Sequence, residues 1–127
     1  MARVTGIGGI FIKGHDRESL GAWYREHLGV PVQDWHGAQF FSRDDASPRE
    51  QGYAVWSLFE ADTDYFGPRP QPFMVNFRVD DLHALLAKLR AAGCVVDEKT
   101  HEDEFGRFGW VTDPEGNRVE LWEPPTG

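Results

Sequence analysis

The sequence predicts an α+β fold made of two similar halves, each with the element order β-α-β-β-β. In each half a short apolar strand leads to an aspartate that is suited to cap a helix, Asp16 in the first and Asp81 in the second. Between the halves, three prolines in the five residues 68–72 exclude a central strand or a helix interior. We therefore expect one domain over residues 1–127, with module one at 1–62, a stiff linker at 63–72 and module two at 73–127.

The first half begins with an apolar strand at Ile7–Ile12. A helix should follow Asp16 and end at Gly29, because apolar residues recur between them at helical spacing. These residues are Leu20, Trp23, Tyr24 and Leu28. Further strands are expected at Val32–Trp35, Gln39–Ser42 and Tyr53–Phe59, with an exposed polar loop at Arg43–Gln51.

The second half repeats this order. A strand at Phe73–Val79 precedes a helix that Asp81 caps and Gly93 ends, with Leu82, Leu85, Leu86 and Leu89 on its apolar face. Three strands are expected at Val95–Lys99, Arg107–Thr112 and Arg118–Trp122, the last two joined by a tight turn at residues 113–116.

The spacing of landmarks supports a duplication. Gly9 precedes Asp16 by seven residues, and Met74 precedes Asp81 by seven. Likewise Gly52 precedes Trp56 by four residues, and Gly116 precedes Glu120 by four.

Composition narrows the classes of function. The chain of 127 residues is 40% hydrophobic and carries a net charge of −8 with no basic cluster, so nucleic acid and anionic membranes are poor partners and a neutral or cationic small molecule fits better. No apolar stretch has the length of a membrane span or a signal peptide, which makes a cytoplasmic protein the expectation. The single cysteine, Cys94, cannot form an internal disulfide, and we expect it to be a small buried apolar residue.

Glu120 is the most unusual residue in the chain, because it places a carboxyl group in the middle of an apolar strand. A buried carboxylate needs a partner. The surrounding segment, Trp110–Trp122 with its Asp-Pro-Glu-Gly-Asn turn, resembles the C-terminal hairpin of the vicinal oxygen chelate superfamily, which includes glyoxalase I, extradiol dioxygenases and bleomycin-resistance proteins. The resemblance covers nearly the whole chain and implies one curved, mostly antiparallel eight-stranded sheet with a concave cup.

In enzymes of this superfamily, four positions in the cup hold a metal ion. By the resemblance they fall here on Gly9, Trp56, Met74 and Glu120, of which Glu120 alone can bind a hard or borderline divalent ion. None of the five histidines is paired with another ligand at helical spacing, and the run His101–Glu104 is typical of a solvated loop. We therefore expect no metal and no cofactor.

The same alignment predicts an aromatic small-molecule site in the cup. Its lining would be Trp56, Met74, Asn76, Arg78, Phe108, Trp110, Glu120 and Trp122. The tryptophans could instead fill the core or a dimer interface, and Arg78 could be simply the salt-bridge partner of Glu120.

The preferred hypothesis is a metal-free binding protein of the glyoxalase/bleomycin-resistance type, acting as a homodimer on an aromatic or cationic ligand. The alternative is a glyoxalase-like lyase, isomerase or dioxygenase in which Glu120 is the catalytic base or a metal ligand. A third possibility is a cup that has lost its ligand and persists as an interaction module. One fold hosts unrelated functions, so the fold alone does not choose among them.

Overall fold

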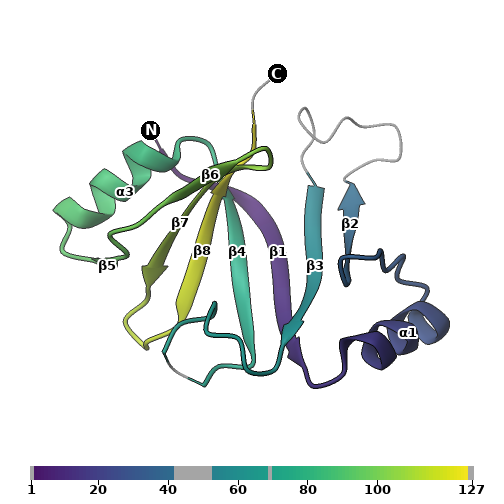
Figure 1. Cartoon of the computed structure of the whole chain (residues 1–127). Coiled ribbons are helices and arrows are strands. Elements are labelled where there is room, and N and C mark those ends of the chain that lie inside the picture. The colour runs from purple at the N-terminus through teal and green to yellow at the C-terminus, as the bar shows by residue number, and fades with distance from the viewer. Residues whose placement is uncertain (1, 42–52, 69, 126–127) are drawn as a thin grey trace.

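The computed structural model describes residues 2–41, 53–68 and 70–125. In the described part of the chain, eight strands form one mixed sheet in the order β2-β3-β1-β4-β8-β7-β5, and β6 pairs with β7 (Figure 1). Pairing is antiparallel except between β1 and β3 and between β4 and β8. The predicted α+β fold with a curved, mostly antiparallel sheet is confirmed.

The first half contributes β1 (Val4–Gly14), α1 (Arg17–Leu28), β2 (Gly37–Phe41) and β3 (Tyr53–Glu60). The predicted caps of α1 are confirmed, since the Asp16 carboxylate accepts from the Ser19 amide and Gly29 has a left-handed φ of 69°. The strand expected at Val32–Trp35 is wrong, because these residues form an irregular segment with a turn that packs against α1. Ser42 and the loop expected at Arg43–Gln51 lie outside the described residues.

The second half contributes β4 (Phe73–Val79), α3 (Leu82–Ala91), β5 (Val95–Val96), β6 (His101–Asp103), β7 (Gly106–Thr112) and β8 (Arg118–Glu123). Asp81 caps α3, and Gly93 follows its end with a φ of 84°, both as predicted. Strand β5 is shorter than expected, and the acidic run contains a short exposed strand where a loop was expected. Cys94 is exposed, which corrects the expectation that it is buried.

Both helices pack on one face of the sheet. Helix α3 covers the β4-β8-β7 side through a core of Val79, Leu82, Leu85, Leu86 and Leu121. Helix α1 lies at the opposite end of the sheet, beneath β3 and β2 (Figure 1). No described helix is long and apolar enough to cross a membrane.

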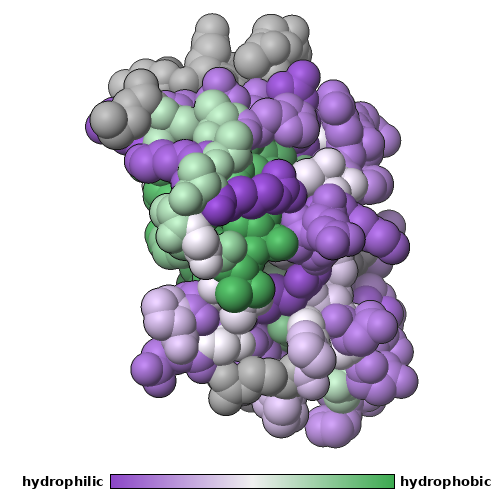
Figure 2. Space-filling view, turned by 90° about the vertical axis from the view of Figure 1, so that its left-hand side faces the viewer, coloured by the Kyte–Doolittle hydropathy of each residue, from purple (hydrophilic) through white to green (hydrophobic). Residues whose placement is uncertain are grey.

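The opposite face of the sheet is the cup, and its core consists of Phe11, Phe66, Met74 and Trp110. Phe66 lies in the segment between β3 and β4 and is fully buried, so this predicted linker packs onto the cup as part of its floor. The side of the molecule that carries α3 and β5 is hydrophilic around one apolar area (Figure 2).

Candidate functional site

Glu120 is the centre of a buried hydrogen-bond cluster in the cup. The residue is 1% exposed. One carboxylate oxygen, Oε1, accepts from Asn76 Nδ2 at 2.7 Å, and the other, Oε2, accepts from Trp110 Nε1 at 2.9 Å and from the Tyr65 hydroxyl. Three neutral donors from three segments therefore replace the water that this carboxylate loses on folding.

Register explains how the donors converge. Asn76 and Glu120 are paired residues of the parallel strands β4 and β8, and Trp110 is the antiparallel partner of Glu120 on β7. Paired residues point to the same face of a sheet, so the two donors flank the carboxylate. The linker segment adds Tyr65, whose ring lies 6.0 Å from that of Trp110 in an edge-on arrangement.

Arg118 fixes the two aromatic donors. Its guanidinium lies over the Trp110 ring at 5.1 Å, its Nε donates to the Tyr65 carbonyl at 3.0 Å, and it forms an ion pair with Asp97 at 3.1 Å. Tyr65 and Trp110 are thereby held against Glu120, and the cluster is ordered before any ligand arrives.

Burial dominates the electrostatics of the cluster. Desolvation raises the pKa of the Glu120 carboxyl, while the bonds from Tyr65, Asn76 and Trp110 and the charge of Arg118 oppose that rise. Desolvation, assisted by the neighbouring Glu120 carboxylate, also raises the pKa of the Tyr65 phenol, which keeps this hydroxyl a donor at neutral pH.

A cavity of about 550 Å³ opens above this cluster. It is lined by Phe11, Trp35, Gln39, Tyr53, Val55, Asn76, Phe105, Phe108 and Trp122. The Trp122 ring is held from several sides: its Nε1 donates to the Phe105 carbonyl at 2.8 Å, Phe108 stacks on it with an angle of 10° between the planes, and Tyr53 packs edge-on at 5.2 Å. The cavity wall is therefore aromatic and rigid, with polar groups supplied by side-chain amides and the Tyr53 hydroxyl.

The structure brings some of the predicted lining residues to this cavity and not others. Asn76, Phe108 and Trp122 line it. Met74, Trp110 and Glu120 share the cup face but are buried beneath it, as parts of the core and the hydrogen-bond cluster.

Two further predicted residues, Trp56 and Arg78, are not among those that line this cavity. Trp56 lies on the helix-bearing face, 4.5 Å from the Tyr24 ring of α1, while Tyr53 and Val55 occupy the cup face of the same strand. Arg78 donates to the Tyr53 carbonyl at 3.3 Å, and it is not among the groups that hydrogen-bond Glu120 in the described part of the chain. The alternative of an Arg78–Glu120 salt bridge is thus wrong.

Sequence reasoning missed Tyr65 and Gly8. Tyr65 belongs to an aromatic pair inside the proline-rich segment, an apolar signal that a solvated linker would not carry. Gly8 lies next to the Asn76 side chain, where a Cβ atom would come within 2.0 Å of Asn76 Oδ1, but a glycine in a strand does not by itself reveal such an approach.

The residues around Glu120 do not suit the metal ion that the superfamily's enzymes bind. The groups facing the carboxylate are two N–H donors and one hydroxyl, and the nearby Met74 has a thioether. Hard or borderline divalent ions prefer several carboxylate or imidazole ligands. Within residues 2–41, 53–68 and 70–125, no group of three or more His, Cys, Asp or Glu side chains could hold a metal ion.

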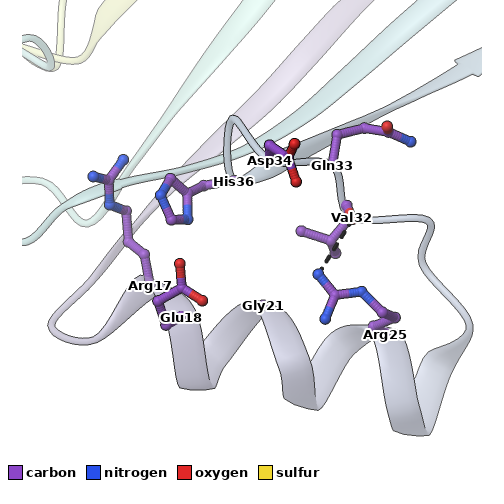
Figure 3. Close-up of a pocket in the computed structure, with 8 residues that line it drawn as sticks. All are labelled: Arg17, Glu18, Gly21, Arg25, Val32, Gln33, Asp34 and His36. Atoms are coloured by element: carbon purple, nitrogen blue, oxygen red, sulfur yellow. Dashed lines mark hydrogen bonds between the residues drawn. The ribbon is translucent and has the colours of Figure 1, made fainter.

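A second, polar pocket of about 250 Å³ lies between α1 and the segment before β2 (Figure 3). It is lined by Arg17, Glu18, Gly21, Arg25, Val32, Gln33, Asp34 and His36. Arg17 pairs with Glu60 at 2.8 Å and Arg25 donates to the Val32 carbonyl at 3.2 Å. With charges of both signs partly satisfied within the protein, this pocket defines no single class of ligand.

Comparison with known proteins agrees with this geometry. Residues 9–122 match the family model described as a glyoxalase-like domain, and the chain belongs to this family. A solved methylmalonyl-CoA epimerase from Streptomyces coelicolor, in complex with 2-nitronate-propionyl-CoA, is 19% identical, with 98% of this chain and 100% of that chain covered and a TM-score of 0.72.

Two further solved structures share the fold. Methylmalonyl-CoA epimerase from Mycobacterium tuberculosis is 22% identical, with 96% of this chain and 89% of that chain covered and a TM-score of 0.61. A glyoxalase/bleomycin resistance protein/dioxygenase superfamily member from Vibrio splendidus 12B01 is 13% identical, with 97% and 99% covered and a TM-score of 0.58. No curated protein matches significantly. At these identities the structures support the fold alone, whereas the family model over residues 9–122 carries the resemblance to the vicinal oxygen chelate superfamily.

Proposed function

We propose that the protein binds a planar aromatic small molecule, neutral or cationic, in the cup without using a metal ion. The observation that carries this proposal is the 550 Å³ cavity with walls of aromatic rings. Cavities of roughly 300–1,000 Å³ with apolar walls and few polar groups are typical of small-molecule sites. The rings of Trp35, Phe105 and Phe108 line the cavity and offer stacking surfaces, and their faces attract cations, as does the net charge of −8.

The position of Glu120 favours binding over acid–base catalysis. A general base must reach the proton that it removes, within hydrogen-bonding distance or through one water. Glu120 is 1% exposed as a residue, and its carboxylate lies beneath the cavity and accepts three hydrogen bonds. We therefore assign Glu120 a positioning role in a binding site and rank the lyase, isomerase or dioxygenase alternative second.

The test is a titration of the protein with a panel of aromatic molecules, neutral and cationic, followed by calorimetry and by tryptophan fluorescence. We expect saturable binding that Phe108→Ala weakens by about tenfold or more, since a stacked ring loses about 0.5–1.5 kcal/mol beyond its buried area. Trp56→Phe is the matched control, because Trp56 lies on the other face of the sheet. Binding that survives Phe108→Ala, or turnover of a hemithioacetal that depends on added divalent metal and on Glu120, would contradict the proposal.

We also propose that the chain forms a homodimer. Ile7, Ile10 and Phe73 on the helix-bearing face of β1 and β4 are each 45–49% exposed. Neither helix covers this strip of the sheet, and apolar surface of this kind is commonly buried between subunits.

A further inference from the structure

The amide of Asn76 is satisfied on one side only. Its Nδ2 donates to Glu120 at 2.7 Å, but its Oδ1 is buried and has no hydrogen-bond partner in the described part of the chain. Buried acceptors are rarely left in this state, and each one costs about 1–3 kcal/mol of free energy. Asn76 also lines the cavity, so an incoming ligand is the natural source of the missing donor.

Glu120 determines which way this amide faces. A carboxylate can only accept, and both of its oxygens are already directed at donors, Oε2 at Tyr65 and Trp110 and Oε1 at Asn76. A flipped amide would place Asn76 Oδ1 against Oε1, where two acceptors repel each other. The acceptor side of the amide must therefore point away from Glu120.

Gly8 leaves the space that the amide oxygen needs. A Cβ atom at this position would lie 2.0 Å from Asn76 Oδ1 and 2.9 Å from Trp122 Cε3. The oxygen thus lies over a glycine and beside the ring of Trp122, which is part of the cavity wall. Asn76 and Trp122 both line the cavity, so a ring bound there has its edge near the amide.

We propose that Asn76, oriented by Glu120, determines the specificity of the cavity and selects aromatic ligands that donate a hydrogen bond from the ring edge, such as an N–H of a heterocycle. This inference rests on the proposed binding function. The donor satisfies the orphaned oxygen, whereas a ligand with a lone pair at the same place leaves two acceptors facing each other. The charge of the Glu120 carboxylate polarises the Asn76 amide and makes its oxygen a stronger acceptor, which further favours a ligand with an N–H at this place.

The test compares two ring systems of nearly equal shape, benzimidazole with its N–H and benzoxazole with an oxygen in place of that N–H. Affinities are measured by NMR titration, following the side-chain amide signals of Asn76. The wild-type protein should bind benzimidazole about three- to tenfold more tightly, the range expected for one net hydrogen bond.

Glu120→Gln should abolish or reverse this preference. The new amide can keep its oxygen towards Tyr65 and Trp110 only by turning its NH₂ group towards Asn76, and Asn76 then flips so that its own NH₂ faces the cavity. Glu102→Gln is the matched control, because the same substitution at this exposed side chain lies far from Asn76 in the sheet and should leave the preference intact.

Equal affinities of the two probes for the wild-type protein would overturn the inference while leaving aromatic binding in place. Failure of both probes to bind would count against the proposed function itself. A preference for benzimidazole that persists unchanged in Glu120→Gln would remove Glu120 from its positioning role. If that variant does not fold, the wild-type comparison still decides whether the cavity selects a donor.

Discussion

Measuring the stability of Glu120 variants tests whether this carboxylate stabilises the fold as the shared acceptor of buried donors. Glu120→Leu removes the acceptor of three donors at once, the Tyr65 hydroxyl, Asn76 Nδ2 and Trp110 Nε1. Each unmet buried donor costs about 1–3 kcal/mol, and the leucine recovers part of that because it needs no desolvation of a carboxyl group. We expect a net loss of about 3 kcal/mol in the free energy of unfolding.

Glu120→Gln is the informative companion. The glutamine has nearly the same shape as the glutamate, and its oxygen still accepts from Tyr65 and Trp110. Its NH₂ group can donate to the oxygen of Asn76 once the Asn76 amide has flipped. We therefore expect a change of about 1 kcal/mol or less. For a chain of this size, 1 kcal/mol corresponds to a shift of roughly 2–8 °C in the midpoint of thermal unfolding. The leucine variant should thus melt about 10–15 °C lower than the wild type, and the glutamine variant within a few degrees of it.

Thermal unfolding followed by circular dichroism and calorimetry measures both values. A leucine variant as stable as the wild type would refute the role of the carboxylate as the shared acceptor. A glutamine variant as unstable as the leucine variant would show that the negative charge itself is required for folding.

Three further predictions concern Glu120, Gly8 and the proposed dimer interface. Burial raises the pKa of Glu120 in the folded protein above its ordinary value of 4.5, so the folded protein binds the proton more tightly than the unfolded chain does. The contribution of Glu120 to stability therefore falls as pH rises from about 4.5 through the folded pKa. Glu120→Gln should gain stability relative to the wild type over that range in denaturant titrations at several pH values, and the opposite slope would contradict the raised pKa. Gly8→Ala should cost about 1–3 kcal/mol by crowding Asn76 and should erase the benzimidazole preference, and an unperturbed variant would show that the amide oxygen does not need this space. Sedimentation should give a dimer that Ile10→Lys dissociates, whereas a wild-type monomer at micromolar concentration would refute the proposed interface.

Local signals predicted the framework of the fold well. The caps of both helices and the strands β3, β4, β7 and β8 were predicted because each depends on residues that are near in sequence. The strand expected at Val32–Trp35 failed for a physical reason. Pro31 precedes it, and His36 closes a turn with a left-handed φ of 68°, so the chain there cannot run straight.

The site was less predictable because it depends on register and on distant contacts. Counting from Gly52 placed Trp56 in the cup, but the face of a strand residue changes with every step, and an error of one position exchanges Trp56 for Val55. Tyr65 reaches Glu120 from a segment with no periodic pattern, over 55 positions along the chain. Local sequence patterns do not predict a contact between residues so far apart in the chain.

Burying the Glu120 carboxylate costs free energy, and its consequence in the proposed site is a fixed orientation of the Asn76 amide. A leucine at this position would fill the same space and leave the Asn76 amide free to adopt either orientation, so the cavity would present a donor or an acceptor with little bias. The carboxylate removes this ambiguity, because it accepts from Tyr65, Trp110 and Asn76 and repels the wrong side of the amide. Arg118 holds the two aromatic donors in place, and Gly8 keeps the space for the oxygen. In the role that we propose, the group that coordinates a cation in metal-dependent members of the superfamily orders the polarity of one amide, and that role needs a buried carboxylate but no open coordination position.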